Sequence, residues 1–266
     1  MRPAERVRRL LDRAHLLLAG AVALQWLTTL VVGLRANEVD LGVAGLVNVV
    51  VLGPLALLLA FRLARRVGGD ALGAWTLLLW VALPWLAPVF TLASYDATRR
   101  DDVLPLVLGL TGDGGYAAGV AALLAVEAST RRRRTEVTIG ALLLALLAAT
   151  LLLRGGSSGT LSLDALQANM AGLRENFWSQ RVLQWLPLAG VVAVARRSVP
   201  LALLLGAWFG SVFVLRAART DVGFENGEFF RVLLPALPAY VLLAAALPLL
   251  VPTLAARLGP LARPAT

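Results

Sequence analysis

Eight stretches of apolar residues follow one another along this chain, and they constrain its fold more than any other feature. A helix needs about 20 apolar residues to cross the ~30 Å hydrocarbon core of a bilayer. The shortest stretch has 17 residues, about 25 Å of helix, and barely crosses this core. The pattern predicts an all-α, polytopic transmembrane bundle of about eight spans, in one integral membrane domain covering residues 1–266. In chain order the stretches are 14–34, 41–63, 71–93, 103–128, 137–153, 178–195, 199–216 and 229–250.

The composition agrees with a membrane protein and excludes several classes of site. Hydrophobic residues make up 59% of the 266 positions, charged residues only 15%, and the mean hydropathy is +0.77. The chain has no cysteine and one histidine, His15, which excludes disulfides, thiolate or histidine-cluster metal sites and a histidine-based triad within one chain. All 25 basic residues are arginine, which excludes lysine Schiff-base chemistry and is typical of GC-rich bacterial coding sequences.

The distribution of arginines predicts the orientation of the spans. If the N-terminus lies in the cytoplasm, 16 arginines fall on the inner side and 9 on the outer side. This excess on one side predicts that both termini are cytoplasmic and that the number of spans is even. The first apolar run continues from Leu16 to Leu34, longer than the apolar region of a signal peptide, so we expect the first span to be an uncleaved anchor in a plasma membrane, the inner membrane of a bacterium. The arginines separate apolar spans and form no continuous basic face, so nucleic acid is not an expected partner.

Carboxylates gather on the side that this topology places outside, which holds 11 of the 16 acidic residues. Acids at a membrane edge act as general bases or hold a divalent cation, and arginine forks bind phosphate oxygens. The alternatives are a solvated turn in the first outer loop and a self-neutralising polar loop in the second. The candidates in these two loops are Glu38, Asp40, Arg99, Arg100, Asp101 and Asp102.

A glycine-rich segment with an acid, Asp113, interrupts the fourth stretch. The 14 residues from Gly115 to Ala128 are too short to cross a bilayer alone. A helix over the whole stretch would instead place Asp113 in its middle, at a cost of about 2.5–3.5 kcal/mol. Two interpretations stay open. One is a surface helix followed by a turn and a short tilted span, and the other is a broken helix in which Asp113 lines a polar, substrate-binding cavity.

The longest outer loop, 154–180, contains a predicted amphipathic helix at 164–178. Asp164 with Gln167 resembles a capping box at its start. An apolar stripe follows at spacings of four, three and four residues, and such a helix lies on the outer leaflet or packs over the bundle. The stripe consists of Leu166, Met170, Leu173 and Phe177.

Arg231 lies just inside the last apolar stretch, where a guanidinium needs a partner. Three partners fit its position. Glu228 is three residues earlier on the same helical face, lipid headgroups are within reach of a long side chain, and an anionic ligand would supply the same charge.

Two segments resemble GT-C-fold membrane glycosyltransferases, the polyprenyl-phosphate-sugar-dependent class that includes dolichyl-phosphate-mannose mannosyltransferases. Arg231 to Tyr240, with the sequence RVLLPALPAY, is similar to a stretch near the end of many members. Leu63 to Gly69, with the sequence LARRVGG, is similar to their turn between two spans. The first outer loop is about six residues long here, whereas in the family it is usually long and carries interfacial helices.

The resemblance implies a hexosyltransferase of the cell envelope that takes a sugar from a polyprenyl-phosphate donor on the outer face of the membrane. It implies that Glu38 or Asp40 is the acidic residue of the first outer loop, and that Arg231 contacts the donor phosphate. Asp101 and Asp102 join the predicted catalytic carboxylates, and Arg99, Arg100 and Asp113 the predicted substrate-binding residues. A divalent cation is a possible cofactor. The alternative functions are a non-catalytic membrane subunit or scaffold, and a small transporter.

Overall fold

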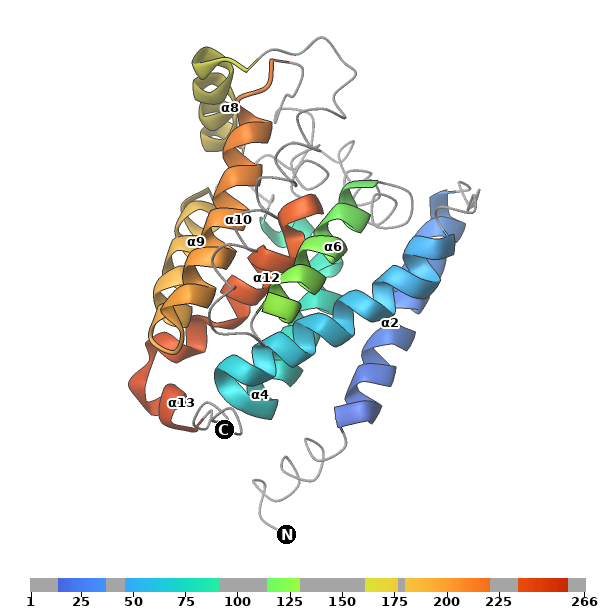
Figure 1. Cartoon of the computed structure of the whole chain (residues 1–266). Helices are drawn as coiled ribbons and strands as arrows, with labels where there is room; N and C mark the ends of the chain where they lie inside the picture. The colour runs from blue at the N-terminus through green and yellow to red at the C-terminus, as the bar shows by residue number, and fades with distance from the viewer. Residues whose placement is uncertain are drawn as a thin grey trace.

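The computed structural model describes residues 14–36, 46–90, 114–129, 161–176, 180–220 and 234–257. Every regular element within these ranges is a helix, which confirms the predicted helical bundle (Figure 1). The fifth predicted span, 137–153, lies outside the described residues. The elements are α2 (Ala14–Ala36), the π-helical turn η1 (Asn48–Leu52), α4 (Gly53–Phe90), α6 (Gly114–Ser129), α8 (Leu163–Asn176), α9 (Gln180–Ala195), α10 (Val199–Ala217), the 3-10 turn η4 (Leu234–Ala236), α12 (Leu237–Ala245), the 3-10 turn η5 (Leu247–Leu250) and α13 (Pro252–Arg257).

The long helix α4 contains two predicted spans that fold back on each other at a pair of glycines (Figure 1). Gly69 has a φ of 78°, a left-handed conformation that glycine adopts without strain. The two halves pack closely, because a Cβ built on Gly73 would lie 2.7 Å from the ring of Phe61. The predicted turn at Leu63–Gly69 is therefore present, with its reversal at Gly68 and Gly69.

Helices joined by a described turn alternate in direction, as the two halves of α4 and the pair α9 and α10 do (Figure 1). Helices α9 and α12 run the same way, because Gly190 lies against the backbone of Leu243, and Arg196 reaches the carbonyl oxygen of Leu250. Helix α10 lies between them in sequence and runs the opposite way after the short turn at 196–198.

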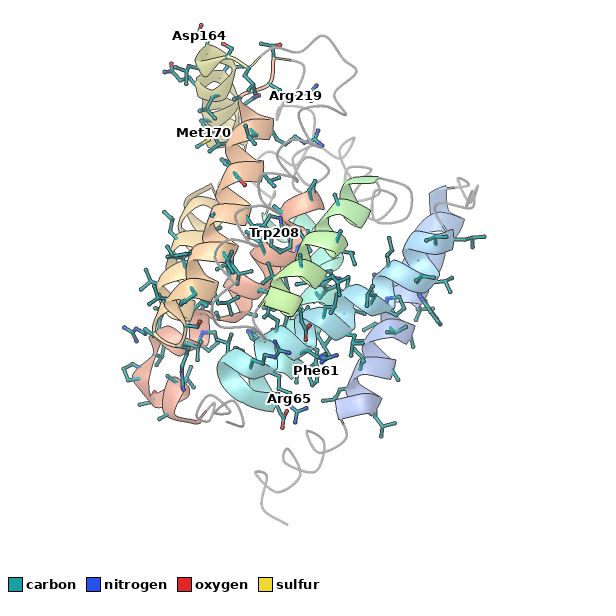
Figure 2. All side chains as sticks on the ribbon, viewed as in Figure 1. Phe61, Arg65, Asp164, Met170, Trp208 and Arg219 are labelled. Carbon is teal, nitrogen blue, oxygen red and sulfur yellow. The ribbon has the colours of Figure 1, made fainter. Side chains whose placement is uncertain are left out.

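This alternation gives the bundle two distinct ends. The turn in α4, the turn between α9 and α10, and α13 lie at one end, and α8 lies at the other (Figure 1). We call the first the basic end, defined by Arg62, Arg65, Arg66, Arg196 and Arg197, and the second the α8 end. Figure 2 shows Arg65 at the basic end and Asp164, Met170 and Arg219 at the α8 end.

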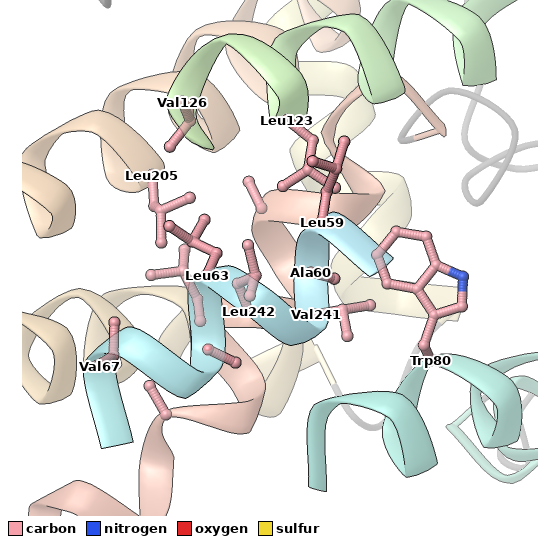
Figure 3. Close-up of a cluster of buried hydrophobic side chains, with 14 of the residues drawn as sticks. Leu59, Ala60, Leu63, Val67, Trp80, Leu123, Val126, Leu205, Val241 and Leu242 are labelled. Atoms are coloured by element: carbon pink, nitrogen blue, oxygen red, sulfur yellow. The ribbon is translucent and has the colours of Figure 1, made fainter. Parts of the chain in front are cut away.

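Large aliphatic side chains from α4, α6, α10 and α12 form the core (Figure 3). One polar group within the core is the side chain of a tryptophan. The indole nitrogen of the fully buried Trp208 donates a hydrogen bond of 3.0 Å to the carbonyl oxygen of Pro235. This bond fixes the start of the Pro-containing segment against α10, because a buried Trp N–H needs an acceptor. The largest fully buried side chains are Trp208, Leu57, Leu63, Leu72, Leu123, Leu205 and Leu243.

Apolar side chains also cover much of the outside of the described bundle. Leu203 is 64% exposed, and Leu78, Leu188 and Val192 are also more than half exposed. Extended exposed apolar surface is typical of a protein that meets lipid or another protein. Within the described residues, Val199–Ala217 is the one helix whose length and hydropathy suffice to cross a bilayer. Shorter apolar helices cover Leu16–Leu27, Ala118–Glu127, Leu186–Ala195 and Leu237–Leu250.

Candidate functional site

A buried carboxylate, Glu127 near the end of α6, is held by two arginines of α4. Arg66 donates a hydrogen bond of 2.6 Å from Nη2 to Oε1 of Glu127, and another of 3.4 Å from Nη1 to the Glu127 carbonyl oxygen. Nη2 of Arg62, one helical turn earlier, lies 3.4 Å from the same Oε1. The Glu127 side chain is 6% exposed, whereas those of Arg62 and Arg66 are 42% and 34% exposed. The cluster therefore joins α4 to α6 by charge at the edge of the core.

A second ion pair crosses the turn of α4. Nε of Arg65 contacts a carboxylate oxygen of Asp70, on the other side of Gly68 and Gly69. Both side chains are well exposed, at 56% and 38%. An exposed pair of this kind contributes about 0–1 kcal/mol. Its geometric effect is to hold the two halves of α4 together at their turn.

The remaining arginines described at the basic end cap helix ends. Arg196 donates to the carbonyl oxygen of Leu250 at 2.9 Å, and Arg197 donates to that of Ala255 at 2.8 Å. The last carbonyl groups of a helix have no partner within it, and cationic donors satisfy them well. These two arginines therefore fasten the C-terminal elements η5 and α13 to the α9–α10 turn.

At the α8 end, polar contacts attach α8 to the end of α10. The Asn169 side chain is buried and donates a hydrogen bond of 2.8 Å to the carbonyl oxygen of Ala217. The backbone N–H of Ser162 donates to the carbonyl oxygen of Ala218 at 2.8 Å, and Leu161 forms an antiparallel bridge with the buried Arg219. Helix α8 is thus fixed to the bundle through its polar side and its first residues.

The predicted amphipathic helix is present as α8, but two details of the prediction are wrong. Ser162 caps the helix, because its Oγ accepts a hydrogen bond from the Asp164 N–H at 3.1 Å, while Asp164 itself lies in the first turn. Asn169, which is not part of the predicted apolar stripe, is the buried residue, and Leu166 and Met170 of the stripe are partly buried. Phe177 lies outside the described residues.

Every residue assigned to the predicted catalytic and substrate-binding sets lies outside the described residues. These are Glu38, Asp40, Arg99, Arg100, Asp101, Asp102, Asp113 and Arg231. Within the residues that the structure describes, no three His, Cys, Asp or Glu side chains come together as a metal site would require.

The Arg62–Arg66–Glu127 cluster was not predicted as a site. In the sequence, Arg62 and Arg66 contribute to the excess of arginine on the predicted inner side, Arg66 also lies in the LARRVGG segment, and Glu127 is one of the five acids on that side. The signal that points to it is a carboxylate at the end of an apolar stretch, which needs a cationic partner. The sequence alone did not indicate which of the many arginines would supply it.

No family model, curated protein or solved structure matches this chain. The residues and the geometry described above therefore carry the functional argument.

Proposed function

We propose that this chain is a multi-pass membrane protein with eight crossings, both termini inside, and its basic end on the cytoplasmic side. Three observations support the proposal: helices joined by a described turn run in opposite directions, large apolar side chains are exposed on the outside of the described bundle, and five of the described arginines lie at the basic end. Positive charge next to membrane spans is retained on the cytoplasmic side. In this arrangement α8 caps the outer face, and the apolar surface of the bundle is solvated by lipid.

Within that framework, we propose a GT-C-type glycosyltransferase that takes a sugar from a polyprenyl-phosphate donor at the outer face. One observation carries this proposal. The described helices that flank 37–45, 91–113 and 221–233 end or begin toward the α8 end (Figure 1). The three connections that contain all the predicted site residues therefore leave the bundle at one end, the end proposed to face outward.

In the core, the turn-containing segment packs against residues that directly follow the second of the two segments resembling the family. Leu63 and Val67, from the turn-containing segment, line the same apolar crevice as Leu242 and Ala246, which lie just after the RVLLPALPAY segment. Figure 3 shows Leu63, Val67 and Leu242 around this part of the core. The volume of about 10 Å³ holds no more than one water molecule, so the crevice is a packing contact. These segments thus act as the framework, and the chemistry is assigned to the connections at the α8 end.

The proposed mechanism uses a carboxylate and an arginine. Asp40 or Glu38 takes the proton from an acceptor hydroxyl as the hydroxyl oxygen attacks the anomeric carbon. The bond from that carbon to the phosphate oxygen breaks, and Arg231 stabilises the negative charge on the departing polyprenyl phosphate. Asp101 and Asp102, with Arg99, Arg100 and Asp113, complete the polar surface that binds the donor headgroup or a divalent cation.

Transfer from a lipid-linked sugar in reconstituted vesicles tests this proposal. Asp40→Asn and Arg231→Ala should each abolish transfer while the protein still inserts. Asp70→Asn is the matched control, because it removes one carboxylate charge at the basic end and should leave transfer unchanged. Wild-type transfer in both site variants would remove these residues from the mechanism and favour a non-catalytic membrane subunit.

A further inference from the structure

One arginine at the basic end has a different environment from the other four. Arg65 pairs with Asp70, Arg66 hydrogen-bonds to Glu127, and Arg196 and Arg197 donate to backbone carbonyl groups. Among the described residues, the Arg62 guanidinium has the 3.4 Å ion pair with Glu127 and no hydrogen bond. A guanidinium carries five N–H donors, so Arg62 has donors that no hydrogen bond to the described residues uses.

The charge around Arg62 is also unbalanced. Three arginines of one α4 turn, at positions 62, 65 and 66, face two carboxylates, Asp70 and Glu127. The short bonds from Arg66 already use the Glu127 carboxylate, and Arg65 uses Asp70. Counted over the described residues, one unit of positive charge therefore stays with Arg62, whose side chain is 42% exposed.

The surface that leads away from Arg62 toward the middle of the bundle is apolar. Leu58 and Leu55 lie four and seven residues before it, on the same face of α4, and both are partly exposed. On α6, Leu124 lies one turn before Glu127 and is 48% exposed. A cationic group at the end of an exposed apolar surface matches a ligand with one anionic end and a hydrocarbon body.

We propose that Arg62 binds the phosphodiester of an anionic phospholipid of the inner leaflet, with an acyl chain along Leu55, Leu58 and Leu124. This inference rests on the multi-pass arrangement proposed above, which brings the basic end to the inner headgroup layer. A phosphodiester carries one negative charge, equal to the surplus at Arg62, and guanidinium forks bind phosphate oxygens well. The Arg66–Glu127 pair holds Arg62 in place and keeps its own charge neutral.

The test measures phospholipid retention on the purified full chain by native mass spectrometry. Phosphatidylglycerol and phosphatidylcholine are offered separately to wild type, Arg62→Gln and Arg65→Gln. Arg65→Gln is the matched control, because it removes the same charge from the same helical turn. Arg62→Gln should weaken phosphatidylglycerol binding about fivefold, and Arg65→Gln should leave it nearly unchanged. Arg62→Lys keeps the charge and should retain most of the binding, which separates loss of the site from loss of the fold.

Several results would overturn the proposal. Equal weakening in Arg62→Gln and Arg65→Gln would mean diffuse attraction to the headgroup layer, and equal retention of both lipids would mean that charge is not recognised. Displacement of phosphatidylglycerol by millimolar inorganic phosphate would identify a free-anion site instead. Alkaline carbonate extraction of the membranes from which the chain is purified separates a failure of the multi-pass arrangement from a failure of the lipid site. A chain released by carbonate contradicts the multi-pass arrangement, whereas an embedded chain in which Arg62→Gln binds like wild type contradicts only the lipid site.

Discussion

Glu127 shows how one ionisable residue can connect two helices at the edge of an apolar core. Its carboxylate is 6% exposed and has two guanidinium groups beside it, one at 2.6 Å and one at 3.4 Å. A carboxylate taken out of water is tolerated only when charge and hydrogen bonds compensate it. Arg66 provides both, through the side chain and the backbone carbonyl group of the same residue. The result is a fixed register between α4 and α6.

Glu127→Gln should therefore destabilise the protein, because Arg66 loses its counter-charge while the shape of the side chain is kept. The expected loss is about 1–3 kcal/mol. Asp70→Asn removes a carboxylate from the exposed pair at the α4 turn and should cost about 0–1 kcal/mol. Thermal unfolding in detergent, followed by tryptophan fluorescence, compares the two variants. Equal melting temperatures for them would show that the buried cluster contributes no more than a surface pair.

Two glycines give a second test at single positions. A Cβ on Gly190 would lie 2.7 Å from the backbone carbonyl carbon and the Cβ of Leu243, whereas one on Gly210 would meet nothing within 4 Å. Both glycines are within helices, so alanine brings the same gain in helix propensity at each. Gly190→Ala should lose about 1–3 kcal/mol by separating α9 from α12, and Gly210→Ala should gain up to about 1 kcal/mol. A Gly190→Ala variant as stable as Gly210→Ala would mean that α9 and α12 do not approach so closely.

At the scale of elements, the sequence predicts where helices occur better than where they end. The seventh span was predicted at 199–216 and is observed as Val199–Ala217, because Pro200 favours a helix start and the apolar run is uninterrupted. The first half of α4 extends four residues beyond its apolar stretch, to Val67, since Ala64 and Val67 are still buried and the helix stops only where the glycines permit a reversal. The start of α8 depends on a single hydroxyl group, that of Ser162, and a hydropathy pattern does not predict such a cap.

The attachment of α8 can be tested through Asn169. Asn169→Leu removes the hydrogen bond to the Ala217 carbonyl group, leaving a buried acceptor without its donor, at a cost of about 1–3 kcal/mol. Because α8 lies at one end of the bundle, the loss should be local. Hydrogen exchange over 163–176 should accelerate while exchange in α10 stays slow. Gln167→Leu, at an exposed position of the same helix, is the control, and equal acceleration in both variants would contradict the anchoring contact.

At the scale of the whole molecule, the sequence predicts the helical class and leaves the polar contacts open. The spacing of apolar residues and the positions of glycines reflect the local conformational preferences of the chain, so the positions of the helices follow from them. The partner of Glu127 depends on which spans lie side by side, and that is decided by packing over the whole bundle. The same reasoning explains Asn169, which is polar in sequence and buried because the end of α10 offers a carbonyl group. The proposed catalytic carboxylates lie in connections outside the described residues and stay a prediction.

The most direct test of the membrane arrangement asks on which side each end of the bundle lies. The natural chain has no cysteine, so a single introduced thiol gives an unambiguous signal. Leu163→Cys reports on the α8 end, where Leu163 is 75% exposed, and Ser198→Cys reports on the α9–α10 turn at the basic end. With a membrane-impermeant maleimide on intact cells, Leu163→Cys should be labelled, and Ser198→Cys should be labelled only after the membrane is opened. Labelling of both thiols from the same side, or of Ser198→Cys alone from outside, would contradict the proposed arrangement.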